Sequence, residues 1–179
     1  MTVRKRFGRD ERGAAGAEFA LWATFLAVPM LGVLDVGVYA QRVMQVNAAA
    51  QVAAQMVWET CDTEAKLPAS DTTKCVALTS PTDRVAAALQ STPLGDTVTL
   101  TAMTEAWFCV DATGDLVEVA AYPATPPATC AAVDPTSTAK PGDYISITVS
   151  HDYTPVFSGF GPSLLLPLPI VRTSTMRLG

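Results

Sequence analysis

The sequence predicts an α+β fold, in which a long N-terminal membrane-spanning α-helix continues into a small globular head with a second helix and an antiparallel β-sheet of about four strands. Three observations predict this fold. The first is an apolar run near the N-terminus, and the second is a set of alternating, β-branched segments in the second half of the chain. Composition is the third, because 49% of the 179 residues are hydrophobic and only 16% are charged. Such a chain is too apolar for an ordinary soluble domain.

Charge is divided unevenly along the chain. Five of the twelve basic residues lie in the first twelve positions against two acids, so residues 1–13 form a leader with a charge of +3. From residue 14 onward, seven basic and fifteen acidic side chains leave a charge of −8. This acidity excludes nucleic acid as a partner, because phosphate binding needs a basic surface.

Residues 14–40 predict a membrane span. Glu18 and Asp35 are their only charges, and the sixteen residues between these acids form about 24 Å of helix, close to a hydrocarbon core of about 30 Å. By the positive-inside rule we expect the leader in the cytoplasm and everything after the span outside, as in a single-pass protein of the cytoplasmic membrane. Pro29 predicts a kink or local loosening of this helix.

The helix is expected to continue outside the bilayer through residues 41–60. This stretch has no proline or glycine, and its apolar residues follow a three- and four-residue spacing. These residues are Val43, Val46, Ala50, Ala53 and Val57. Such a small, uncharged face suits close packing against the chain's own head or against neighbouring copies.

Residues 61–179 predict the globular head. Ser80 and Pro81 are typical of a helix start, and the helix is expected to run to about Ser91. Its core face consists of Val85, Ala88 and Leu89.

Four segments rich in β-branched and aromatic residues predict strands: 96–110, 116–122, 144–153 and 170–178. The first two form a hairpin around the turn at residues 111–115, and residues 123–141, with five prolines, form a loop.

The apolar segment at residues 153–169 contains four prolines, so it cannot be one regular element. We expect it to cover an open edge of the core. The alternative is a patch that binds a partner or lies on the membrane surface.

Four cysteines, at positions 61, 75, 109 and 130, suit two disulfides in an oxidising compartment. Three pairings are open. We favour Cys61 with Cys75 and Cys109 with Cys130, which close short loops.

The sequence predicts no catalytic site, no metal site and no cofactor. His151 is the single histidine, it lies at the end of a strand, and no serine in a nucleophile turn accompanies it. A structural strand histidine is the favoured interpretation.

The junction between leader and span has an unusual order. Residues 12–19 read RGAAGAEF, so Gly13 and small residues are followed by Glu18 and Phe19 before the apolar run. An ordinary signal peptidase cuts after the apolar segment, where this chain has no small-residue cleavage turn. A cut between Gly13 and Ala14 would instead remove only the charged leader and leave the helix on the mature protein.

These residues resemble the prepilins of the tight-adherence (Tad, or Flp) pilus system, specifically the TadE-like pseudopilins. Gly13 matches the residue before the cut, Ala14 the first mature residue, and Glu18 and Phe19 the fifth and sixth. The similarity extends over residues 9–60. It includes Asp35-Val36-Gly37 at the exit of the span and Val46-Asn47-Ala48-Ala49 beyond it. Separately, the closing residues 172–177 are similar to the final strand of the family.

The resemblance implies a minor pilin with a pilin-like helix that acts in assembly or initiation of a Tad-type (type IVc-like) pilus, and hence in adhesion and surface colonisation. Implied partners are a prepilin peptidase, other minor pilins, the major Flp pilin, the inner-membrane assembly platform and membrane lipid. Glu18 is expected to pair with the free amine of Ala14 on an adjacent subunit and so set subunit register. Alternatively, the side chain of Glu18 simply extends to the membrane interface, where its carboxylate is hydrated.

A second hypothesis comes from another class of protein. The chain would be an uncleaved, signal-anchored periplasmic module whose head binds a ligand. It predicts retention of the leader and normal function on an unrelated anchor.

Overall fold

A computed structural model describes residues 11–71, 73–75, 84–157 and 165–178 of the chain. The chain divides into two compact units. The first contains Met1–Ala40 and Thr154–Leu166, and the second contains Gln41–Tyr153 and Pro167–Gly179. The predicted Ser80 and Pro81 helix start lies outside the described residues.

Helix α1 (Glu11–Thr60) begins in the first unit and ends in the second, and it passes through Pro29 without interruption. In the first unit, every described side chain from Ala15 to Leu34 is exposed; the buried position there is Gly32. Mean hydropathy reaches 1.9 within the helix. By length and composition α1 can therefore cross a membrane once, as the sequence predicts.

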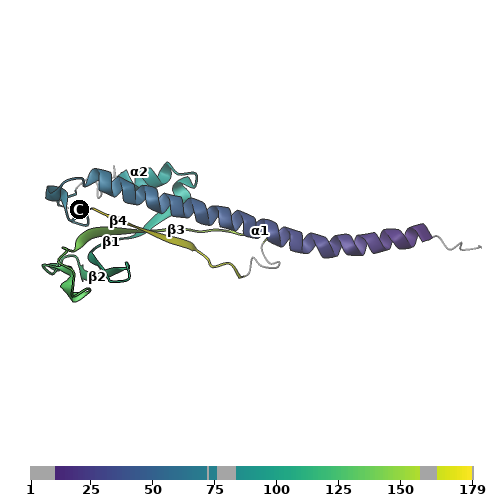
Figure 1. The fold of residues 1–179 in the computed structure, drawn as a ribbon. Coiled ribbons are helices and arrows are strands. Elements are labelled where there is room, and N and C mark those ends of the chain that lie inside the picture. The colour runs from purple at the N-terminus through teal and green to yellow at the C-terminus, as the bar shows by residue number, and fades with distance from the viewer. Residues whose placement is uncertain (1–10, 72, 76–83, 158–164, 179) are drawn as a thin grey trace, which may run out of the picture. The chain divides into compact units, whose positions relative to one another are not determined.

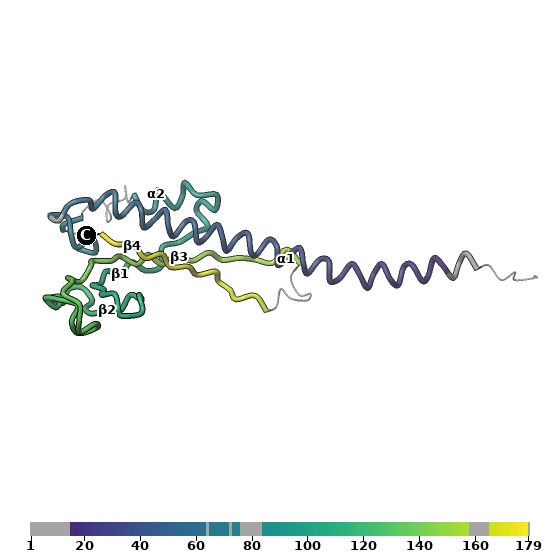
Figure 2. The backbone as a smooth tube through the Cα atoms, in the orientation of Figure 1, coloured from purple at the N-terminus to yellow at the C-terminus, as the bar shows by residue number. Residues whose placement is uncertain are grey.

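The second unit contains a four-stranded antiparallel sheet with the order β2-β1-β3-β4. Its strands are β1 (Val98–Val110), β2 (Leu116–Ala121), β3 (Gly142–His151) and β4 (Ile170–Arg177) (Figure 1). All four predicted strands and the predicted hairpin are confirmed. The connection from β2 to β3, green in Figure 2, leads from one side of β1 to the other and carries the short helix η4 (Cys130–Ala132).

Three strand ends differ by two residues from the prediction: the third strand ends at His151 rather than at residue 153, and two strands have different starts for local reasons. The first strand begins at Val98 rather than residue 96, because Gly95 has a φ of +53° and opens the short helix η3 (Gly95–Thr97). The Thr97 hydroxyl donates to the carbonyl of Leu94 at 2.6 Å and closes this turn. The third strand begins earlier than predicted, at Gly142, because Phe108 of β1 already pairs with it.

The core of the second unit lies between helices and one face of the sheet. Figure 1 shows the second half of α1 running along the sheet, and α2 (Arg84–Gln90) contacts β1. The buried apolar side chains that α1 contributes to this core are Val46, Ala49, Ala50, Ala53, Ala54 and Val57, and those of β3 include Ile145, Ile147 and Val149. The predicted core face of α2 is confirmed, since Val85, Ala88 and Leu89 are buried.

On the opposite face of the sheet, the middle of β3 and β4 is polar. Ser146 and Thr175 share a hydroxyl hydrogen bond of 3.0 Å, and Thr148 and Thr173 share one of 2.8 Å. Because side chains alternate along a strand, the isoleucines of β3 face the core while its hydroxyls face away.

Candidate functional site

The predicted processing junction lies at the start of α1. The helix begins at Glu11, so Gly13, Ala14 and Glu18 all have helical backbone. Glu18 is exposed, and the side chain of Phe19 is 75% exposed. Within the described ranges, no ion pair joins Glu18 to the rest of the chain. The junction therefore offers Glu18 and an apolar surface to molecules outside the chain.

Asp35 differs from every other described side chain of α1 before it. It is 0% exposed, and its Oδ1 accepts a hydrogen bond from the backbone N–H of Val156 at 2.8 Å. The N–H of Phe157 donates to Oδ2 at 3.2 Å and approaches Oδ1 at 3.4 Å. Both partners belong to the first unit. Within the apolar segment 153–169, Val156 and Phe157 thus bind α1 through Asp35, while residues 158–164, which the prediction of a covered core edge also includes, lie outside the described residues.

An open cleft of about 590 Å³ lies on the second unit. Its lining combines two aromatic side chains, Trp107 and Tyr122, with four prolines and charges of both signs. The prolines are Pro68, Pro123, Pro126 and Pro141, and the charged residues are Lys140, Asp143 and Arg177. An apolar pocket with a few polar groups is the usual form of a small-ligand site.

A pair of buried acids lies beside this cleft. Glu105 on β1 is 6% exposed and Asp143 on β3 is 4% exposed. Oε1 of Glu105 accepts from the N–H of Ala69 at 3.0 Å, and its Oε2 accepts from the N–H and the hydroxyl of Ser70, each at 2.7 Å. These three donors replace the water that burial removes from the carboxyl group of Glu105.

Asp143 has the opposite environment. Burial, followed by the negative charge of Glu105, raises the pKa of Asp143 from its ordinary 3.8 to about 7. Its Oδ1 is buried and has no hydrogen-bond partner among the described residues. Asp143 therefore keeps its proton to a higher pH than an ordinary carboxyl group does.

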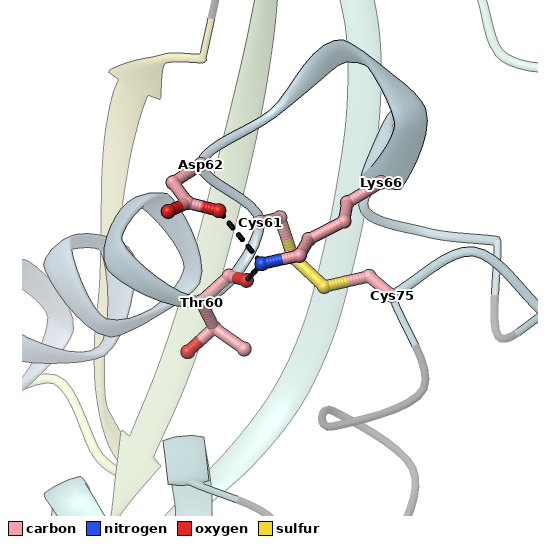
Figure 3. Close-up of polar contacts among 5 residues, drawn as sticks. All are labelled: Thr60, Cys61, Asp62, Lys66 and Cys75. Atoms are coloured by element: carbon pink, nitrogen blue, oxygen red, sulfur yellow. Dashed lines mark hydrogen bonds and ion pairs between the residues drawn. A yellow bond between two sulfur atoms is a disulfide. The ribbon is translucent and has the colours of Figure 1, made fainter.

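The favoured disulfide pairing is confirmed. Cys61, directly after α1, bonds to Cys75 over a Cα–Cα distance of 5.9 Å (Figure 3). Beside this disulfide, Nζ of Lys66 donates to the carbonyl of Thr60 at 3.1 Å and to Oδ1 of Asp62 at 2.7 Å. The end of α1 is thus fixed by a covalent bond and by a capped carbonyl.

The second disulfide joins Cys109 of β1 to Cys130 of the proline-containing loop, over a Cα–Cα distance of 5.5 Å. This loop supplies Pro126 and Lys140 to the cleft, so the disulfide holds one cleft wall against the sheet.

His151 has a structural environment. Its side chain is 8% exposed, and Nδ1 lies 3.0 Å from the carbonyl oxygen of Thr97. The neighbouring Asp152 is exposed. Among the residues that the structure describes, no three His, Cys, Asp or Glu side chains gather to hold a metal ion.

Sequence reasoning missed three functional candidates: the Asp35 contact, Glu105 and Asp143. Each depends on a partner more than thirty residues away in the chain. An acid within the predicted strand 96–110 was the available signal for Glu105, whereas Asp143 lies one residue before the predicted strand 144–153 and had no such signal.

No protein-family model, no curated protein and no solved structure matches this chain. Its function is therefore inferred from its own sequence and geometry.

Proposed function

We propose that this protein is a minor pilin, or pseudopilin, of a Tad-type pilus, and that it acts in pilus assembly or initiation. One observation supports this most: a basic leader, Gly13, small residues, Glu18 and Phe19 come before the apolar run of a helix that extends from Glu11 to Thr60. A cut after Gly13 leaves an apolar helix whose exposed side chains from Ala15 to Leu34 can contact lipid or neighbouring helices.

Glu18 gives this helix a means of assembly. A carboxylate inside the hydrocarbon is costly unless it finds a cation. Cleavage after Gly13 creates a cation at the amine of Ala14, four residues from Glu18. Pairing of Glu18 with that amine on an adjacent subunit sets the axial register of the two helices.

The proposal places the head on the outer side of the cytoplasmic membrane, with the leader in the cytoplasm until it is removed. The prepilin peptidase, the assembly platform, other minor pilins and the major Flp pilin are the expected partners. The two disulfides suit an oxidising location for the head.

The N-terminus of the mature protein tests the proposal. We expect intact-mass analysis to show loss of residues 1–13 in cells with a prepilin peptidase, and the full chain in cells that lack it. A protein that begins at Met1 in both strains contradicts the processing step, and with it the proposal.

Substitution of Glu18 tests the register role separately. Glu18→Ala is expected to abolish pilus assembly while processing and membrane insertion continue. Glu59→Ala is a matched control, because Glu59 is also an exposed acid of α1 but lies in the second unit. Wild-type assembly by the Glu18 variant is incompatible with the register role.

The second hypothesis, an uncleaved anchored binding module, has one observation in its favour. The cleft beside Trp107 and Tyr122 is large enough for a small ligand. This hypothesis predicts an intact leader in every strain, so the same mass measurement separates the two functions.

A further inference from the structure

Asp35 is buried where its helix neighbours are exposed. Burial of a carboxylate is unfavourable unless hydrogen bonds replace its water. Here the replacements are the N–H groups of Val156 and Phe157. The segment Thr154–Phe157 therefore lies directly against α1 at the level of Asp35, and both belong to the same compact unit.

The position of Asp35 along α1 indicates how deep this contact lies in the bilayer. Asp35 lies twenty-one positions after Ala14, which corresponds to about 32 Å of helix. A hydrocarbon core is about 30 Å thick. When Ala14 lies at one edge of the hydrocarbon, Asp35 lies at the other edge, and so does the segment that it binds.

The chemistry of the bound segment suits that edge. No charge occurs between Tyr153 and Pro169. Val156 is 63% exposed and Leu165, in the same unit, is 85% exposed. Exposed apolar side chains without charged neighbours are unfavourable in water, but they are stable at the boundary between headgroups and acyl chains.

The apolar surface of α1 identifies lipid as the occupant. Leu31, Leu34 and Val36 are 38–51% exposed on the turns around Asp35. The exposed Val156 is held at that same level, so the apolar surface of the helix and that of the segment meet the same solvent. Lipid that surrounds the helix at this level therefore also contacts Val156.

We propose that Thr154–Phe157, together with Leu165, forms a second membrane-contacting element, hereafter the interfacial loop, which Asp35 fastens to the end of the span. The loop enters the interfacial layer of the bilayer on the side opposite the leader. Asp35 is its positioning residue. This inference rests on membrane insertion of α1, which it shares with the proposed function, but it needs neither cleavage nor a pilus.

Site-specific fluorescence on the full chain in phosphatidylcholine–phosphatidylglycerol vesicles tests the proposal. Val156→Cys and, separately, Leu165→Cys carry an environment-sensitive label, with the native disulfides kept oxidised. Leu26→Cys reports insertion of the span. Ala112→Cys, in the exposed turn between Asp111 and Asp115, reports an aqueous site.

We expect quenching of the labels at positions 156 and 165 by lipids brominated near the headgroup. Their quenching by aqueous iodide should be several-fold weaker than at position 112. Asp35→Ala should raise iodide quenching at position 156 to the level of position 112. Asp35→Asn, whose side-chain oxygen still accepts a hydrogen bond, should retain most of the lipid quenching.

Two results overturn the inference. If the label at position 26 is quenched by lipid while those at 156 and 165 remain open to iodide, the interfacial loop is wrong and the anchor stands. Position 26 lies near the middle of the span and is therefore tested with lipids brominated near the end of the acyl chains; if these lipids do not quench it, the membrane anchor fails, and the pilin proposal fails with it. Because the processing junction lies about twenty residues from Asp35, the mature mass of Asp35→Ala should equal that of the wild type.

Discussion

Glu18 and Asp35 are the two acids of the predicted span, and they differ in burial and in hydrogen bonding. Asp35 is buried and satisfied by backbone donors of its own chain. Glu18 is exposed. An acid that the chain satisfies internally is suited to a structural role, whereas an exposed acid in an apolar helix is available to a partner from outside. This difference supports an intermolecular role for Glu18 and an intramolecular one for Asp35.

The pair Glu105–Asp143 predicts a pH dependence of stability. Because the folded-state pKa of Asp143 is about 7 and its ordinary value is 3.8, the folded protein binds more protons than the unfolded one between these values. Stability attributable to Asp143 is thus present below about pH 4 and is lost as pH rises to about 7. Asp143→Asn keeps a neutral group beside Glu105 and should remove this loss.

The measurement is the free energy of unfolding of the full chain in detergent micelles, as a function of pH. The free energy of unfolding of Asp143→Asn minus that of wild type should be larger at pH 8 than at pH 4, by on the order of 2–4 kcal/mol. Asp152→Asn, at an exposed acid two residues beyond Ser150, should show no such trend. The opposite slope for the Asp143 variant would mean that Asp143 is stabilised in its charged form.

Among the elements, α1 depends on small residues where it meets the core. Ala49, Ala50, Ala53 and Ala54 are all 0% exposed. Ala50→Leu should lower the free energy of unfolding by about 1–3 kcal/mol, because a well-packed core has no room for the added carbons. Ala48→Leu is the matched control, since Ala48 is exposed on the same helix and should change stability by less than about 0.5 kcal/mol.

Chemical denaturation of both variants measures this effect. If Ala50→Leu is as stable as Ala48→Leu, then the alanine face is not packed in the protein alone. The face would then be available to neighbouring subunits, which is the alternative that the sequence left open.

The two disulfides are short-range elements, with sequence separations of 14 and 21 residues. Loops of this size predict that removal of each disulfide lowers the free energy of unfolding by about 3 kcal/mol. The double variants Cys61→Ser with Cys75→Ser, and Cys109→Ser with Cys130→Ser, test each one by denaturation. Addition of a reductant to the wild type should reproduce their combined loss, and a smaller loss would indicate residual structure in the reduced, unfolded chain.

Helices, strands and the hairpin were predictable because their signals are local. The β-branched run and its turn define β1 and β2, and the three-and-four spacing identifies the buried face of α1. The Asp35 contact was not predictable, because its donors are backbone groups 121 and 122 residues away. Backbone N–H groups carry no sequence signature. The cleft likewise depends on loops that only the folded sheet brings together.

At the scale of the whole molecule, the net charge of −5 combines a leader of +3 with a remainder of −8. The two compact units divide within α1 at Ala40, so one helix belongs to both. In the pilin proposal the first unit supplies assembly and the second supplies the stable head. In the binding-module hypothesis the first unit supplies attachment alone.

Replacement of the anchor separates these two roles. A chimera in which an unrelated, uncleaved apolar helix replaces residues 1–34 keeps Asp35 and therefore the donors that bind it. Its head should fold, form both disulfides and insert in the membrane, because none of the second unit is altered. If assembly requires the amine of Ala14 and the carboxylate of Glu18, the chimera should leave a deletion strain without pili and with adhesion at the level of that strain. Full restoration of adhesion by a correctly folded chimera would contradict the pilin proposal and favour a head that functions by ligand binding.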